Sequence, residues 1–284
     1  WDAITRTAIT QNYNTAISGG TENGRYRVSA GYLDQQSVIE TSKLKKITAN
    51  LTSSFKFLES KKLGLDINVL VTQTNEDIAP ISAFVGFTGN VVSQALQWNP
   101  TLKVRQNKDS ITTLGGTTIN PLSSLAYYKD NAVVNTIVAS FSPSYKITDD
   151  LEYKFLYSVN RQVGIRKGMV DRRLNLEGIL DHGVAFIGNN EQTNQQITNT
   201  LSYNKEVSSG FNVNAVVGHE WLIFNNRDNF MSGKDFQNIG LNYYDYIQQG
   251  LTSNRSIGSY TSPTTELQSF FARAILNLQD KYLI

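Results

Sequence analysis

Residues 47–71 read ITANLTSSFKFLESKKLGLDINVLV. Apolar and polar residues alternate from Ile47 to Phe57 and again from Leu63 to Val71, and a short charged connection separates the two runs. Successive side chains of a β-strand point to opposite faces, so each run places its apolar residues on one face and its polar residues on the other. The stretch therefore predicts a two-faced antiparallel hairpin, because a period of two does not fit an amphipathic helix.

The same alternation recurs along the 284 residues. It predicts strands at 10–18, 25–33, 45–57, 63–74, 133–147, 150–161, 193–205, 210–224 and 266–278. Short polar turns alternate with long loops, which are expected at 75–132, 162–192 and 225–265. Loops of that length are uncommon in compact soluble domains, whereas outer-membrane barrels combine long extracellular loops with tight periplasmic turns. We therefore predict an all-β, antiparallel, up-and-down transmembrane β-barrel wall of about nine strands.

The composition agrees with such a wall. Hydrophobic residues make up only 40% of the chain, which suits strands that keep one face wet. No run approaches the roughly 18 consecutive apolar residues that a membrane-spanning helix needs. The net charge is +2 with basic and acidic residues interspersed, so no basic tract indicates a nucleic-acid partner. Cysteine is absent, which excludes disulfides and thiolate metal sites.

Charged residues decide which strand face points to the lumen. The apolar rows expected to face lipid are Tyr26, Val28, Ala30, Tyr32, Leu151, Tyr153, Phe155, Tyr157, Val159, Phe270, Ala272, Ala274, Leu276 and Leu278. The charged residues expected to face the lumen are Arg25, Arg27, Lys56, Asp66, Glu152, Lys154 and Arg273. On the lipid side, each Arg or Lys near the membrane midplane would cost about 2 to 4 kcal/mol. The two faces are therefore not interchangeable.

Aromatic residues gather in the expected extracellular loops. The candidates for contact with a substrate or a protein lid are Trp98, Tyr127, Tyr128, Tyr243, Tyr244 and Tyr246. Aromatic rings stack on apolar surfaces and anchor protein interfaces. The alternative is that the rings pack the loops against one another, and the sequence leaves both possibilities open.

No known catalytic motif fits the sequence. His219-Glu220 begins like a zinc-protease helix motif, but Ile223 stands where the second histidine is required and the context is a strand. His182 lies in an Asp-His-Gly sequence typical of a turn. The chain contains no nucleophile elbow, phosphate loop or dinucleotide fingerprint, and the acidic residues of 225–265 lack calcium-loop spacing. We expect no catalytic activity, no cofactor and no metal site.

Segments 11–23 and 26–35, read QNYNTAISGGTEN and YRVSAGYLDQ, resemble a barrel hairpin of the SusC/RagA-like TonB-dependent transporters of Bacteroidota. Further matches are WNPTL at 98–102, NPL at 120–122, and FFAR at 270–273 followed by DKYL at 280–283. The matches cover nearly the whole chain in consistent order. One departure is QNKDS at 106–110, where relatives often carry an Asp-Gly turn.

This resemblance implies a 22-stranded barrel of the cell outer membrane with an N-terminal plug and a segment that engages TonB. It also implies a SusD-like lipoprotein over the extracellular mouth and proton-motive import of oligosaccharides or oligopeptides. About nine strands cannot close such a barrel. Residues 1–284 are therefore expected to be an interior part of the barrel, with the plug, the TonB contact and the other strands elsewhere in the protein.

Two other classes of protein stay open. A soluble or surface-attached β-sandwich that binds polysaccharide would pack the same apolar faces inward. A barrel-borne hydrolase would need a nucleophile beside a base, and the sequence shows no such arrangement.

Overall fold

A computed structural model describes residues 1–58, 60–81, 90–108, 110–112, 118–174, 182–279 and 281–283. Its strands are β1 (Thr10–Thr21), β2 (Gly24–Gln36), β3 (Lys43–Phe57), β4 (Leu63–Asp77), β5 (Tyr128–Lys146), β6 (Leu151–Val170), β7 (Val184–Ser208), β8 (Phe211–Lys234), β9 (Ser256–Thr261), β10 (Thr265–Leu278) and β11 (Tyr282–Leu283). The helices are α2 (Val91–Gln97) and α3 (Pro121–Tyr127), with 3-10 turns η2 (Tyr243–Asp245), η3 (Ile247–Gln249) and η4 (Thr252–Asn254). Within these ranges no helix combines the length and the apolar character needed to cross a membrane.

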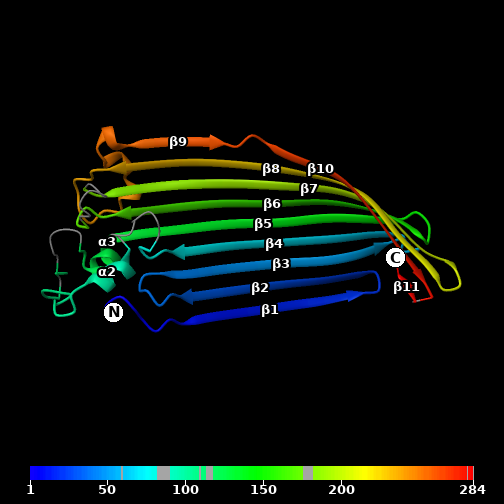
Figure 1. The fold of residues 1–284 in the computed structure, drawn as a ribbon, viewed down its shortest axis with the longest axis horizontal. Coiled ribbons are helices and arrows are strands. Elements are labelled where there is room, and N and C mark those ends of the chain that lie inside the picture. Colours follow the sequence, from blue (N-terminus) through cyan, green and yellow to red (C-terminus); the bar gives the residue numbers. More distant parts are fainter. Residues whose placement is uncertain are drawn as a thin grey trace.

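All the strands join in one antiparallel sheet (Figure 1). The order β1 to β8 follows the chain, so each strand pairs with the next through a hairpin connection. The outer side of β8 pairs with β10 along residues 211–224 and with β9 along residues 227–232. The predicted all-β, antiparallel, up-and-down architecture is confirmed, and each of the nine predicted strands is present. The short strands β9 and β11 are not among those nine.

Several strands run further than the alternation predicted. β6 continues to Val170, β7 begins at Val184 and β8 continues to Lys234. The predicted loops 162–192 and 225–265 are therefore too long, because much of each belongs to a strand. In these extensions both faces carry polar residues. For example, Arg161 pairs with Glu191 on the face that is apolar nearer the tight turns. The hydrogen-bonded ladder continues there although the apolar–polar alternation has stopped.

Strand register gathers the predicted rows onto two faces. Residues directly opposite each other on neighbouring strands share a face. One run of such partners passes through Val28, Leu51, Val69, Ala139 and Val159. A second run passes through Tyr153, Leu201, Val217 and Ala272. All three predicted apolar rows thus lie on one side, the apolar face, and the seven predicted lumen charges lie on the other, the polar face.

Glycines in the strands are covered by rings from neighbouring strands. The pairs of direct register partners are Gly19 with Tyr26, Gly24 with Phe55, Gly168 with Phe186, Gly218 with Phe271, and Gly258 with Phe230. In each pair the ring occupies the place where a glycine Cβ would stand; at Gly168 that atom would be 2.6 Å from Cε1 of Phe186. The ring fills the gap that a strand glycine leaves, which restores packing across the sheet.

Buried apolar residues lie mainly at one end of the sheet. This is the end that carries α2 and α3 (Figure 1). These residues form three clusters: Ile119, Tyr128, Val170, Leu174 and Val184; Met169, Ala185, Phe236 and Tyr243; and Ile4, Val91 and Leu125. Both faces of the sheet are otherwise uncovered in the described part of the chain. Large apolar side chains stay exposed on the apolar face, Phe270 at 81%.

Two Asn-Pro motifs shape the long connection between β4 and β5. Asn120 caps α3 by accepting a hydrogen bond from the Leu122 amide at 3.0 Å, with Pro121 in the first turn. Asn99 accepts hydrogen bonds from the Thr101 amide at 3.0 Å and its hydroxyl at 2.8 Å, and so closes a turn. The residues that carry the family resemblance in this connection are thus the ones that set its backbone.

Candidate functional site

The polar face offers hydrogen bonds along its whole length. Lys154 Nζ lies 3.3 Å from Asp66 Oδ2 and links β6 to β4 across β5. Gln196 Nε2 donates to Glu220 Oε2 at 2.7 Å. The seven charged residues predicted for a lumen all lie on this face. They are distributed over strands β2 to β10 and do not form one center. Such a surface suits contact with water or a polar ligand.

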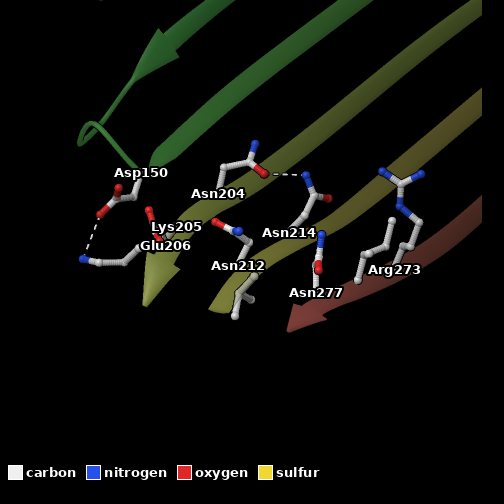
Figure 2. A pocket seen from close by; sticks show the side chains of 10 residues that line it. Asp150, Asn204, Lys205, Glu206, Asn212, Asn214, Arg273 and Asn277 are labelled. Carbon is white, nitrogen blue, oxygen red and sulfur yellow. Dashed lines mark hydrogen bonds and ion pairs between the residues drawn. The ribbon is translucent and has the colours of Figure 1, made fainter. Parts of the chain in front are cut away.

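At the tight-turn end, the polar face is hollowed into a cavity of about 530 Å³ between β7, β8 and β10 (Figure 2). Its lining includes Asn212, Asn214, Arg273 and Asn277, and at its margin Lys205 Nζ lies 2.9 Å from Asp150 Oδ2. Asn214 donates its amide to Asn204 across the two strands. Carboxamides and charged groups dominate its lining, so the cavity offers many hydrogen-bond donors and acceptors.

At the loop end, two of the predicted contact residues are buried. Tyr128 is 4% exposed and donates its hydroxyl to Asp130 Oδ2 at 2.8 Å. Tyr243 is 1% exposed, stacks on Phe236 at 4.3 Å between ring centroids, and donates to the Asn238 carbonyl at 2.6 Å. For these two rings the packing alternative is the one that the burial favours.

The other predicted aromatic residues are more accessible. Tyr246 is 42% exposed, and Trp98 is half-buried after the end of α2. Lys167 Nζ lies 4.7 Å from the ring centroid of Tyr244, and the Arg173 guanidinium lies 4.5 Å from that of Tyr127. Cations over these rings fix them against β6 and the segment after it. Trp98 comes from the connection between β4 and β5, whereas Tyr244 and Tyr246 come from the one between β8 and β9.

Two ion pairs that the sequence did not predict hold the loop end together. Arg166 donates through Nε and Nη2 to the two carboxylate oxygens of Asp130 at 3.0 and 2.6 Å, and the Asp130 side chain is fully buried. Arg173 makes the same two-point contact with Asp171, at 2.9 Å for both bonds. Burial alone would raise the pKa of Asp171, but hydrogen bonds and attraction from Arg173 outweigh it and lower that pKa. No sequence spacing indicates the first pair, since its members are on different strands.

The two histidines lie in different environments, one in a strand and one in a loop. The His219 ring lies 4.8 Å from the Phe270 ring on the apolar face, in a strand as predicted. Exposed His182 lies 3.2 Å, Nδ1 to Oδ1, from Asp235 in the loop region. Among the residues with described positions, no three metal-ligating side chains come together.

Comparison with known proteins gives a consistent set of relatives, although no family model matches the chain. TonB-dependent receptor P3 of Formosa agariphila is 28% identical over 99% of the chain and 28% of its own length. TonB-dependent receptor SusC of Bacteroides thetaiotaomicron is 26% identical over 99% of the chain and 29% of its own length. The chain thus spans less than a third of these relatives.

Solved structures agree on the fold. The RagAB peptide importer in its open-open state superposes with a TM-score of 0.78, at 18% identity, over 98% of this chain and 31% of that one. The siderophore receptor PiuA from Acinetobacter baumannii gives a TM-score of 0.55 at 8% identity, over 99% of this chain and 42% of that one. At these identities the likeness shows the fold alone. Taken with the sequence relatives, residues 1–284 are a stretch of outer-membrane β-barrel wall, similar along its whole length to the SusC/RagA-like TonB-dependent transporters of Bacteroidota.

Proposed function

We propose that the protein containing this chain imports a nutrient oligomer, an oligosaccharide or an oligopeptide, across the outer membrane with energy delivered through TonB. The observation that carries the proposal is one sheet with an apolar face and a polar face, matched over its whole length by SusC. The apolar face meets lipid and the polar face, with its seven charged residues, lines the lumen. Relatives named as receptors and importers support transport rather than catalysis.

A SusD-like lipoprotein is the proposed partner on the extracellular side. The end of the sheet that carries α2, α3 and the long connections would face it (Figure 1). Within that end, Trp98, Tyr244 and Tyr246 are the residues proposed to touch the lipoprotein or the substrate. Tyr127, Tyr128 and Tyr243 would support them by holding the loops to the sheet.

The other working parts lie outside residues 1–284 in this proposal. The relatives are more than three times as long as the stretch that they share with this chain. A plug, a TonB-contacting segment and the remaining strands would come from the rest of the protein. In the described residues β1 pairs on one side only, which leaves an edge for a further strand.

The β-sandwich alternative lacks support from the structure. A sandwich needs a second sheet against the apolar face. The described ranges form a single sheet, and side chains such as Ile17, Phe270 and Tyr13 stay 60% or more exposed on that face. In water such a face would be an aggregation-prone patch, whereas lipid covers it.

Affinity purification of the intact protein from native membranes tests the proposal. We expect extraction only with detergent, a co-purifying SusD-like lipoprotein identified by mass spectrometry, and oligomer uptake that stops when TonB is deleted. Recovery from the soluble fraction, or uptake that continues without TonB, would overturn it.

A further inference from the structure

A second cavity, of about 420 Å³, opens on the polar face between β5, β6, β7 and β8. Gly164 and Gly188 form its floor on neighbouring strands. A Cβ added at Gly188 would meet no atom within 4 Å, and one at Gly164 would meet only Val134, at 3.7 Å. Phe230 of β8 is the register partner of Gly188 in β7, yet its ring covers Gly258 in β9, the neighbour of β8 on its other edge. Unlike the five ring-covered glycines, Gly188 is left open, and its open space is part of a cavity of ligand size.

One wall of this glycine cavity is apolar and held in place. The Phe186 ring lies over Gly168, and the Arg166 guanidinium carbon is 5.8 Å from the ring centroid. Arg166 is itself fixed by its two hydrogen bonds to buried Asp130. An aromatic ring braced in this way presents a surface that is already ordered before a ligand arrives, which lowers the entropic cost of binding.

The opposite wall is polar and carries one uncompensated charge. The Asp228 carboxylate accepts hydrogen bonds from Asn190 Nδ2 at 2.6 Å and Asn226 Nδ2 at 2.8 Å. A carboxylate accepts about four hydrogen bonds, so Asp228 keeps capacity for further donors. No cation pairs with it in the described part of the structure, whereas the charge of Arg166 is matched by Asp130. The cavity therefore attracts hydroxyl donors and repels anions.

The glycine cavity lies at the loop-end edge of the apolar band. On the other face of the sheet at the same height, Asn189 donates to Asn229 at 2.6 Å and Arg161 pairs with Glu191 at 2.7 Å, beside Ile165, which is 44% exposed. Polar pairs of this kind mark the border of the hydrocarbon layer. A soluble oligomer that enters from the loop end would meet this part of the wall first.

We infer that the glycine cavity is a subsite for one ring of an uncharged oligosaccharide. The flat glycine floor and the Phe186 wall accept the apolar side of a sugar ring, while Asp228 and Asn190 bind its hydroxyls. A carboxylated or sulfated sugar is repelled by Asp228. The strands that form the cavity are paired on both sides, so side chains supply its polar contacts, and the oligopeptides of the test panel decide between a sugar and a peptide ligand. The inference rests on the proposed function and names its substrate class.

Calorimetric titration of the full-length protein, purified in detergent, tests the subsite. The ligands are neutral glucan, mannan, galactan and xylan oligomers, uronate-containing and sulfated oligomers, and mixed oligopeptides. We expect a neutral oligosaccharide to bind, and Gly188→Leu, which fills the floor, to weaken that binding by about tenfold or more. Ser158→Leu, on the same face of β6 nearer the turns, is the matched control and leaves binding unchanged. Unboiled gel mobility verifies that each variant is folded.

If Gly188→Leu does not assemble, the variant Asp228→Asn tests the same subsite. Asp228→Asn removes the charge and keeps the shape, so neutral binding weakens by about tenfold while discrimination against uronates falls. Unchanged affinity in both variants, or binding of oligopeptides alone, or no binding by any oligosaccharide of the panel, overturns the subsite. If TonB-dependent uptake persists in those cases, the proposed function stands and only the subsite fails.

Discussion

At the scale of single residues, the fully buried carboxylate of Asp130 must be paired for the loop end to be stable. Arg166 neutralises it at 2.6 Å and Tyr128 donates a third hydrogen bond. Removal of one partner of a buried ion pair costs about 3 to 5 kcal/mol because it leaves an unpaired charge. Arg166→Ala should therefore lower protection of residues 128–134 in hydrogen exchange more than Asp130→Asn does, since the asparagine leaves no buried charge. Equal effects of the two variants would refute this role.

Asp171 gives the loop end a defined pH response. Its pKa is lowered in the folded protein, so its ion pair with Arg173 contributes stability above the unfolded pKa of about 3.9. That contribution is lost as the pH falls through the lower, folded value. Hydrogen exchange of residues 171–174, corrected for intrinsic rates, should show constant protection from pH 7 to pH 5 and a loss below about pH 4. Asp171→Asn should lack this pH step; a loss already at pH 6 would rule out Asp171 as its cause.

At the scale of strands, the ring that covers a glycine is the unit of packing across the sheet. Phe271 of β10 covers Gly218 of β8, so Gly218→Ala forces the ring to move and should destabilise the protein by about 1 to 3 kcal/mol. In the Phe271→Ala background the same substitution should cost much less, because the space is free. Urea unfolding from lipid vesicles measures both. Additive costs in the double variant would contradict the pairing.

The positions of most strands could be predicted from the sequence, but the full length of several strands could not. Alternation identified every strand in the apolar band, because lipid and water impose a period of two there. It stopped at residue 161, although β6 continues to Val170, since a strand wet on both faces needs no alternation. β9 was missed because its 6 residues are too few to show a clear alternation.

The candidate site was only partly predictable. The charges on the polar face follow directly from strand parity. The neighbours Tyr127 and Tyr128 look alike in sequence, yet β5 begins at Tyr128 and turns that ring into the core. The glycine cavity depends on the register between β6, β7 and β8 and on the rotamer of Phe230. Neither can be predicted from the residue types alone.

At the scale of the whole molecule, the two faces of the wall should tolerate charge very differently. Val69 and Asn68 are adjacent in β4 but lie on the apolar and the polar face. Val69→Arg should cost about 2 to 4 kcal/mol in the membrane, whereas Asn68→Arg should cost little. Outer-membrane abundance and unfolding from vesicles compare the two. Similar losses for both variants would mean that lipid does not cover the apolar face.

The most direct test of the account is an accessibility scan of residues 47–57 in native outer membrane. This stretch contains no cysteine, so single cysteines can be introduced and spin-labelled one by one. Power-saturation measurements with oxygen and a water-soluble nickel complex report lipid and water at each position. We predict nickel accessibility at the even positions and oxygen accessibility at the odd ones other than Ser53, which the sheet itself buries. Shielding of the exposed odd positions Ile47, Leu51 and Phe57 from both reagents would show that another protein layer packs on this face, and would contradict a membrane wall.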